Sequence, residues 1–267
     1  MVTELGGRRF DWGSRVYVMG VVNATPDSFS GDGLTDPEAA VAHGLRLVAE
    51  GADILDVGGE STRPGHSPVT AEVELARVIP VVRRLAASAG VPISIDTAKP
   101  AVGQAAVAAG ASLVNDIWGL RREPDLGRLA AEAGCGIIVM HNRERSEYDD
   151  LLAEVEADLR RSIALAAEFG IPDARVIVDP GIGFGKTAEH NLELLRGLDR
   201  LRSLDRPVLV GTSRKSFIGK ILDLPPDQRV EGTAATVAAA VLRGADIVRV
   251  HDVLAMTRVV RVAERLR

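Results

Sequence analysis

The chain has 267 residues, a length that allows either one large barrel or two smaller domains. Hydrophobic residues make up 46% of the sequence and aromatic residues only 3%, so we expect one large core built from Val, Ile, Leu and Ala. A formal net charge of -5 provides no long-range attraction for nucleic acid or for anionic membranes, and we expect neither as a partner.

The N-terminal segment lacks the apolar region of a secretory signal, and no stretch approaches about 18 uninterrupted apolar residues. The single cysteine, Cys135, excludes a disulfide within the chain and a cysteine-rich zinc site, and its apolar neighbours indicate a buried structural thiol. These features predict a soluble cytoplasmic protein.

In chain order, the sequence repeats one unit, in which a short β-branched run ends in polar residues and is followed by a segment rich in Ala, Leu, Glu and Arg. Each run has the length of a strand, and most runs are apolar on both faces, as is typical of buried parallel strands. The first fifteen residues precede these runs, and we expect them to form a small hairpin or plug over the bottom of a barrel. The predicted strands cover residues 16–23, 53–59, 92–97, 112–117, 136–141, 175–181, 207–213 and 246–252.

The segments between the runs carry helix start and stop signals. The first, residues 37–51, has Pro37 near its start and ends at Gly51. A glycine also ends several later segments, at the position where a helix C-cap is expected. These glycines are Gly110, Gly134, Gly170 and Gly244.

Strict alternation of strands and helices implies a parallel sheet, and eight units favour a closed (β/α)₈ TIM barrel. The alternative, an open doubly wound sheet, would usually show a G-x-G-x-x-G turn after the first strand, but Asn23 and Ala24 follow it here. Because no linker or low-complexity tract interrupts the pattern, we predict a single domain over residues 1–267.

Polar residues end all of the predicted strands, which is more than solubility requires. In a barrel these ends converge on one mouth, where the active sites of such enzymes lie, so the pattern predicts an enzyme. The residues concerned are Asn23, Asp56, Glu60, Ser61, Thr62, Arg63, Asp96, Asn115, Asp116, His141, Asp179, Ser213, Arg214, Lys215, Ser216, Arg249, His251 and Asp252.

Their chemistry separates two groups. Asp96, Asn115 and Asp179 offer carboxylates and an amide that suit the donor edge of a flat, nitrogen-rich heterocycle. A second, cationic group suits a phosphate or diphosphate, which arginine binds in a bidentate manner. Its members are Arg63, Lys215, Arg249 and His251.

Three further segments have less specific interpretations. The Gly-rich segment 179–187 lacks the spacing of a P-loop, and its glycines are expected to let the backbone approach a ligand. Asp56 has no cation in its own segment, so a structural hydrogen bond and a catalytic role are equally favoured. Residues 143–150 are charged and predict a solvent-exposed loop, and Trp118 is expected to pack over the barrel top.

The motifs together resemble dihydropteroate synthase, the folate-pathway enzyme targeted by sulfonamides. They occur in order from the first strand to the last, so the resemblance covers nearly the whole chain. The matching segments are MGVVNATPDSFS (19–30), GADILDVGGESTRPG (51–65), ISIDTAKP (93–100), LVNDIWG (113–119), VMH (139–141), VDPGIGFGKTAEHNLELL (178–195), VLVGTSRKSFIG (208–219) and ADIVRVHDV (245–253).

The resemblance implies a transferase that joins 7,8-dihydropterin-6-ylmethyl diphosphate to 4-aminobenzoate and releases diphosphate and 7,8-dihydropteroate. It implies Asp96, Lys215 and Arg249 as catalytic residues. The pterin and its diphosphate would be bound by Thr62, Arg63, Asp96, Asn115, Asp179, Lys215, Arg249 and His251. The aminobenzoate would be bound by Thr62, Arg63, Pro64, Phe184, Lys215 and Ser216.

The resemblance also implies Mg²⁺ as cofactor, with Asn23 as its ligand, and a homodimer formed through late barrel helices such as residues 230–244. The chain departs from the family at Gly31 and Asp32, whose order is reversed, and we hypothesise that Asp32 still helps to close this loop over magnesium. Two alternatives stay open: a corrinoid methyltransferase-type pterin barrel, and a paralogue that binds pterin without catalysis.

Overall fold

In a computed structural model that describes residues 1–25, 33–60 and 68–267, eight parallel strands form one sheet in the order β8-β7-β6-β5-β4-β3-β10-β9. The two outer strands meet where Val178 of β8 forms a parallel bridge with Val208, next to β9. The N–H of Val178 donates to the carbonyl of Pro207 at 2.9 Å in the same place. The sheet therefore closes, which confirms the predicted TIM barrel and excludes the open doubly wound alternative.

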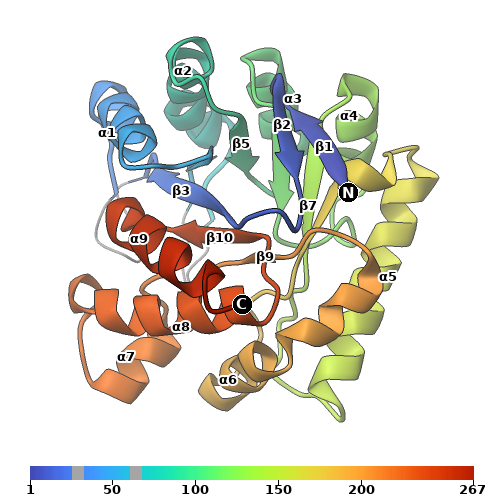
Figure 1. The fold of residues 1–267 in the computed structure, drawn as a ribbon. Coiled ribbons are helices and arrows are strands. Elements are labelled where there is room, and N and C mark those ends of the chain that lie inside the picture. Colours follow the sequence, from blue (N-terminus) through green and yellow to red (C-terminus); the bar gives the residue numbers. More distant parts are fainter. Residues whose placement is uncertain (26–32, 61–67) are drawn as a thin grey trace.

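The strands lie where the β-branched runs predicted them, and the helices surround them (Figure 1). The barrel strands are β3 (Tyr17–Asn23), β4 (Ile54–Gly58), β5 (Ile93–Asp96), β6 (Leu113–Asp116), β7 (Gly136–Met140), β8 (Val176–Asp179), β9 (Leu209–Val210) and β10 (Ile247–Val250). The helices are α1 (Pro37–Ala49), α2 (Ala71–Ser88), α3 (Pro100–Ala108), α4 (Asp125–Ala133), α5 (Leu151–Glu168), α6 (Ala188–Arg196), α7 (Ser216–Leu222), α8 (Val230–Leu242) and α9 (Val253–Glu264).

Strand β9 is shorter than the run 207–213 predicted. Gly211 follows its last residue, and the N–H of Lys215 then donates to the carbonyl of Thr212 at 3.2 Å, which turns the chain out of the sheet. Residues 211–213 therefore belong to the mouth of the barrel rather than to its wall.

The helix boundaries follow the predicted caps. Asp36 caps α1 by accepting hydrogen bonds from the N–H groups of Glu38 and Ala39, and Pro37 occupies the first turn. Past the helix, Gly51 has a φ of 110°, a left-handed conformation that a residue with a Cβ adopts only with strain. The chain thus leaves the helix at the glycine and reaches β4 within a few residues.

The N-terminal segment forms the predicted hairpin, with β1 (Val2–Leu5) paired antiparallel to β2 (Arg8–Asp11). Leu5, Phe10 and Trp12 are buried and join one hydrophobic cluster with the inward-facing side chains of the strands. Figure 1 shows the hairpin in front of the strands, on the face where both termini lie. The hairpin therefore plugs the bottom of the barrel and leaves the opposite end for the site.

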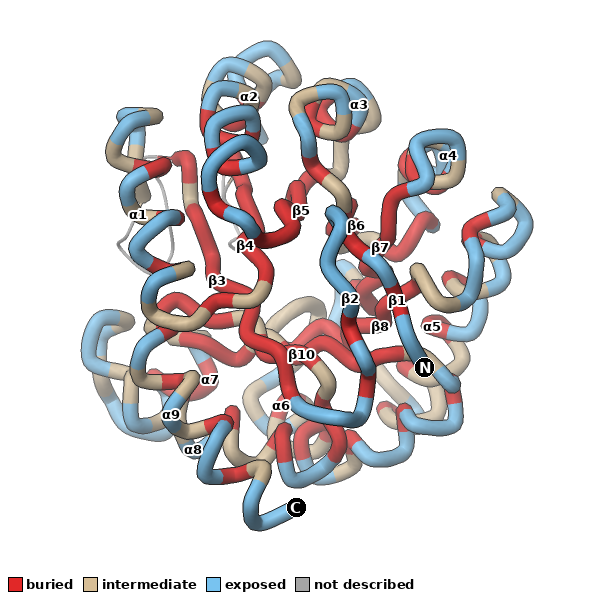
Figure 2. Tube along the Cα trace, turned by 45° about the horizontal axis from the view of Figure 1, so that its top comes forward, coloured by how far each residue is buried: buried red, intermediate tan, exposed pale blue. Residues whose placement is uncertain are grey.

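The barrel strands are buried, and the outward faces of the surrounding helices are exposed (Figure 2). Cys135 is buried as expected, and burial raises the pKa of its thiol. Among the described residues, no helix is long and apolar enough to cross a membrane.

Candidate active site

Side chains alternate between the two faces of a strand, and this alternation puts the polar residues of the mouth on the inner face of the barrel. Ile54, Leu113, Ile177 and Ile247 belong to the apolar cluster inside the barrel. Side chains two positions further along a strand lie on the same face, one level closer to the mouth. These positions hold Asp56, Asn115, Asp179 and Arg249. The apolar interior thus gives way to a layer of charged and amide groups.

Arg249 is the centre of this layer. Its Nε donates to Asp56 Oδ2 at 2.6 Å, and its Nη2 donates to Asp96 Oδ2 at 2.7 Å. Asn115, which pairs with Asp96 in the register of β5 and β6, donates from Nδ2 to Asp56 Oδ2 at 3.0 Å. The anion-binding group and the heterocycle-reading group, separated by their chemistry in the sequence, are therefore in direct contact.

The sequence left two roles open for Asp56, a structural hydrogen bond and a catalytic role, and its contacts favour the first. Its side chain is fully buried, and one oxygen accepts hydrogen bonds from both Arg249 and Asn115. The carboxylate therefore orients two residues of the predicted site. Its cation comes from β10, 193 positions away, so its own segment contained no sign of the pairing.

Burial changes the acid–base properties of this layer. It raises the pKa of Asp96 to about 7, while the positive charge of Arg249 acts in the opposite direction and the charge of Asp56 reinforces the rise. It also raises the pKa of Asp179, although the N–H of Gly181 donates to that carboxylate at 2.7 Å. Near neutral pH, Asp96 can therefore donate or accept a hydrogen bond.

Lys215 enters the site from the loop before α7. Its Nζ donates to the carbonyl of Ile182 and lies 4.2 Å from the centroid of the Phe184 ring. Burial lowers the pKa of Lys215 to about 8, although Asp179 favours its charged form. Ser216 is the first residue of α7, directly after it. The structure thus brings Lys215 and Phe184 together, as the predicted aminobenzoate site requires.

His251 follows the last strand and is held by Ser213. Its Nδ1 lies 2.9 Å from Ser213 Oγ, and its backbone N–H donates to the same hydroxyl at 3.2 Å. Arg214 and Asp252, the next residue of each loop, form a two-point ion pair at 2.6 and 3.0 Å. The loops after β9 and β10 are therefore tied together, which fixes His251 and Lys215 relative to one another.

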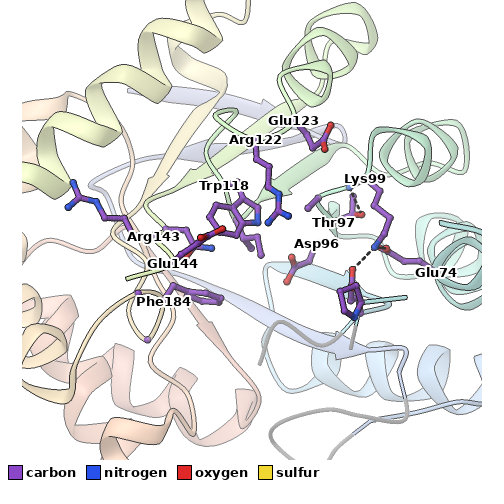
Figure 3. A pocket seen from close by; sticks show the side chains of 17 residues that line it. Glu74, Asp96, Thr97, Lys99, Trp118, Arg122, Glu123, Arg143, Glu144 and Phe184 are labelled. Carbon is purple, nitrogen blue, oxygen red and sulfur yellow. Dashed lines mark hydrogen bonds and ion pairs between the residues drawn. The ribbon is translucent and has the colours of Figure 1, made fainter. Parts of the chain in front are cut away.

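A pocket of about 540 Å³ opens above these groups. Asp96, Trp118 and Phe184 line it, and Figure 3 shows their side chains gathered around the same space from β5 and from the loops after β6 and β8. Arg122 lies 4.8 Å above the Trp118 ring. Trp118 therefore packs at the top of the barrel, as expected, and also forms part of the pocket wall.

The charged segment 143–150 is largely exposed, as predicted, but two of its side chains are anchored. Arg143 donates to Glu154 at 2.6 Å and to Asp158 at 3.2 Å, and its guanidinium lies 4.7 Å from the ring of Tyr148. The hydroxyl of Tyr148 donates to the carbonyl of Gly185 at 2.9 Å. Residues 144–147, 149 and 150 are exposed, which agrees with the predicted solvent-exposed loop, while acids on α5 and the neighbouring loop anchor Arg143 and Tyr148.

The comparisons with known proteins agree with this geometry. A family described as "Pterin binding enzyme" matches residues 19–251. The dihydropteroate synthase of Clostridium beijerinckii is 45% identical over 98% of this chain and 98% of its own length. The chain belongs to the dihydropteroate synthase family. The relatives from Clostridium beijerinckii, Bacillus subtilis and Escherichia coli are all named dihydropteroate synthase. These names favour neither the corrinoid methyltransferase alternative nor a paralogue without catalysis.

Solved structures of the family have the same fold. A Yersinia pestis dihydropteroate synthase in complex with a sulfonamide drug superposes with a TM-score of 0.95, at 40% identity, over 100% of this chain and 99% of that one. The Xanthomonas albilineans enzyme with 4-aminobenzoic acid gives a TM-score of 0.93, at 46% identity, over 99% and 97% of the two chains. The match extends over the whole barrel, including the mouth.

Several predicted residues of the family site lie outside the described part of the chain. They are Thr62, Arg63 and Pro64, together with Asp32 of the proposed magnesium loop. Asn23 is described and ends β3, where it pairs with Gly58 of β4. In the described residues, no group of three or more His, Cys, Asp or Glu side chains is placed to hold a metal ion.

Two glycines of the Gly-rich loop bring it close to the neighbouring loop. A Cβ added at Gly181 would overlap the carbonyl of His141, and one added at Gly185 would overlap the carbonyl of Arg143. Both glycines have positive φ angles, of 70° and 56°. These two glycines thus let the loop after β8 pack against the backbone of the loop after β7. The approach of this loop to a ligand stays a prediction.

Proposed function

We propose that the mouth of this barrel joins 4-aminobenzoate to 7,8-dihydropterin-6-ylmethyl diphosphate, with release of diphosphate. The function is that of a dihydropteroate synthase in folate biosynthesis. The observation that carries the assignment of roles is the contact of Arg249 with Asp56 and Asp96, beside Asn115. The cation that we assign to the leaving group thus contacts the acceptors that we assign to the pterin.

In this proposal the pterin is recognised through hydrogen bonds to Asp96, Asn115 and Asp179. A pterin presents an amino group and ring N–H groups, and each needs an acceptor when it leaves water. Carboxylate and amide oxygens at the ends of β5, β6 and β8 supply them. Lys215 adds a donor for the pterin's own acceptors. A ligand without these groups would leave buried charges unpaired, so the set is selective.

The reaction exchanges one bond for another. The C–O bond between the pterin methylene and the diphosphate breaks, and its electron pair leaves with the diphosphate. The aminobenzoate nitrogen then forms a C–N bond to that carbon and loses a proton to solvent. Arg249 and His251 stabilise the negative charge of the departing diphosphate, with Arg63 as their predicted partner. The Asp96 carboxylate stabilises positive charge on the methylene.

The aminobenzoate is bound in this proposal by Phe184, Lys215 and Ser216, together with Thr62, Arg63 and Pro64. The ring of Phe184 supplies an apolar surface, and the Lys215 ammonium, 4.2 Å from that ring, supplies a cation near the acid. The solved relative that holds 4-aminobenzoic acid supports this choice of second substrate.

Mg²⁺ fits the donors at the end of β3. It prefers oxygen ligands and usually keeps several waters while it binds substrate phosphates through few protein groups. Asn23 offers one amide oxygen at the mouth, and the described residues hold no acidic cage that would compete for the ion. We assign Asn23 as the protein ligand. Bound beside the diphosphate, the ion would neutralise part of the leaving group's charge.

A homodimer is the assembly that we propose. Large apolar side chains are exposed on the outer faces of the late helices, with Leu242 on α8 44% exposed and Val262 on α9 64% exposed. Leu254 and Leu266 extend the same apolar character along the C-terminal helix region. Sedimentation of the native protein and of Val262→Asp tests the assembly, since a charge in the interface would favour monomers. The cytoplasmic location stays a prediction.

The deciding assay measures diphosphate release from the pterin diphosphate with and without 4-aminobenzoate, and detects dihydropteroate by mass. We expect condensation that depends on both substrates and that Asp179→Asn slows strongly. The control, Glu132→Gln, removes an exposed acid on α4 and should react like the native protein. Absence of condensed product in the native protein would refute the proposal.

A further inference from the structure

Lys186 ends the Gly-rich loop between β8 and α6, and its side chain turns back into that loop. Its Nζ lies 2.9 Å from the carbonyl of Gly181 and 2.9 Å from the carbonyl of Phe184. A third contact joins it to Nδ1 of His141 at 2.8 Å. One amine therefore joins two carbonyls of this loop to His141, the residue that follows strand β7.

The histidine that follows β7 is held in a defined state. His141 is 1% exposed, and burial, reinforced by the charge of Lys186, lowers its pKa to about 2, so the imidazole is neutral. Its Nε2 lies 3.3 Å from the Asp158 carboxylate, which favours a proton on that nitrogen. Nδ1 is then an acceptor for the Lys186 amine, whose own pKa burial lowers well below its ordinary value. The amine thus has three acceptors within reach, the two loop carbonyls and this nitrogen.

The same loop carries groups that the condensation uses. The carbonyl of Ile182 accepts from Lys215, and the Phe184 ring lies beneath the Lys215 ammonium. Gly183 packs against the Lys215 side chain, where a Cβ would lie 2.8 Å from its Cδ. A shift of this loop would therefore move Phe184 and the anchor of Lys215 together.

We propose that Lys186 is a positioning residue for the aminobenzoate half of the site. Its amine joins the loop's two carbonyls to His141 and so holds Phe184 and Lys215 in place, without contacting substrate itself. The inference rests on the proposed roles of Phe184 and Lys215. The pterin acceptors Asp96 and Asn115 lie on strands and are held by Arg249 and Asp56, outside this tie. Asp179, in contrast, accepts from the N–H of Gly181 in the loop, and Lys215 also serves the pterin, so part of the pterin site depends on the tie.

The first test replaces Lys186 by Met, which keeps the length of the side chain and removes its donors. We expect the KM for 4-aminobenzoate to rise about tenfold or more, because small misplacements of binding groups cost that much. The KM for the pterin diphosphate should rise less, because Asp96 and Asn115 keep their own supports. Lys220→Met, on the exposed side of α7, removes the same charge and should change neither constant.

A rescue experiment separates positioning from packing. Lys186→Ala lacks three carbons and the amine, which is the composition of propylamine. Added propylamine should lower the KM for 4-aminobenzoate toward the native value, and propanol, with one donor, should do so far less. Equal rises of both KM values in Lys186→Met, or rescue by propanol as good as by propylamine, would overturn the inference.

Two more variants keep the test decisive. If Lys186→Met does not fold, Tyr148→Phe removes only the hydroxyl that donates to Gly185 in the same loop, and should raise the aminobenzoate KM selectively by a few fold. Unchanged constants in that variant would count against the inference. Phe184→Ala tests the proposed function separately. If it raises the aminobenzoate KM while Lys186→Met does not, only the role of Lys186 is refuted; if it has no effect, the aminobenzoate site itself is refuted.

Discussion

Replacing Asp96 by Asn should stabilise the folded protein above neutral pH while it weakens pterin binding. Burial raises the pKa of Asp96 from 3.8 to about 7, so the ionised carboxylate is less favourable in the folded state than in the unfolded chain. Asn keeps the shape of the side chain and an oxygen that accepts from Arg249. It removes the charge, and with it the dependence of stability on pH at this position.

The size of the effect follows from proton linkage. Between the two pKa values the folded protein binds more protons than the unfolded chain, so its free energy of unfolding falls as pH rises through that window. A difference of about three pKa units, at about 1.4 kcal/mol for each unit, amounts to about 4 kcal/mol when the pH has passed the folded value. About 3 kcal/mol of this falls between about pH 5 and about pH 8.

Urea unfolding of the native protein and of Asp96→Asn, without ligands, measures this difference. We expect the advantage of the variant to grow from about pH 5 and to level off above about pH 7, because titrating groups that do not interact with Asp96, such as Asp116, are common to both proteins and cancel. Glu132→Gln, an exposed acid on α4, is the control and should show no such trend. A difference that stays constant or shrinks with pH would refute the burial argument. Binding of the pterin diphosphate should be lost in the same variant.

Three further predictions concern other parts of the mouth. Because burial lowers the pKa of Lys215 to about 8, kcat/KM for the pterin diphosphate should fall above that pH as the cation is lost, and Lys215→Arg should move the decline to higher pH, as a pH–rate profile would reveal. Gly185→Ala should cost about 1–3 kcal/mol more than Gly90→Ala in thermal unfolding, because both positions have left-handed φ angles but only Gly185 faces the Arg143 carbonyl. Asn23→Ala should raise the Mg²⁺ concentration needed for half-maximal rate, and an unchanged titration would exclude it as the ligand.

The architecture was predictable because each of its determinants is local. Apolar runs bounded by polar ends define the strands, and glycines such as Gly51 and Gly110, both left-handed in the structure, mark the helix ends. The alternation of the two element types then implies a parallel barrel. The hairpin was predictable from its place before the first strand, but its role as a plug depends on Leu5 and Trp12 meeting side chains from several distant strands.

The residues of the site could be predicted from the sequence, but the hydrogen bonds and ion pairs between them could not. Position at a strand end identifies Asp96, Asn115 and Arg249 as neighbours in a closed barrel. Arg249 pairs with Asp56 because the two side chains lie at the same height inside the barrel. That height is set by the stagger between strands, which the sequence of a single strand does not reveal. Lys186 was seen only as part of a rejected phosphate motif, because its partner His141 belongs to another segment.

The contact between Arg249 and the two acids explains how this mouth stays charged before substrate arrives. Removing a carboxylate or a guanidinium from water is costly unless an opposite charge meets it at close range. Asp56 and Arg249 meet this condition at 2.6 Å, and Asp96 shares the same cation at 2.7 Å, so a single positive group lies between two negative ones, of which Asp56 is fully buried. Burial is the main cause of the raised pKa of Asp96, and the charge of Asp56, which shares the one cation, adds to it. In the proposed function a pterin brings N–H donors to Asp96, so we expect ligand binding to recover the destabilisation that Asp96→Asn should relieve.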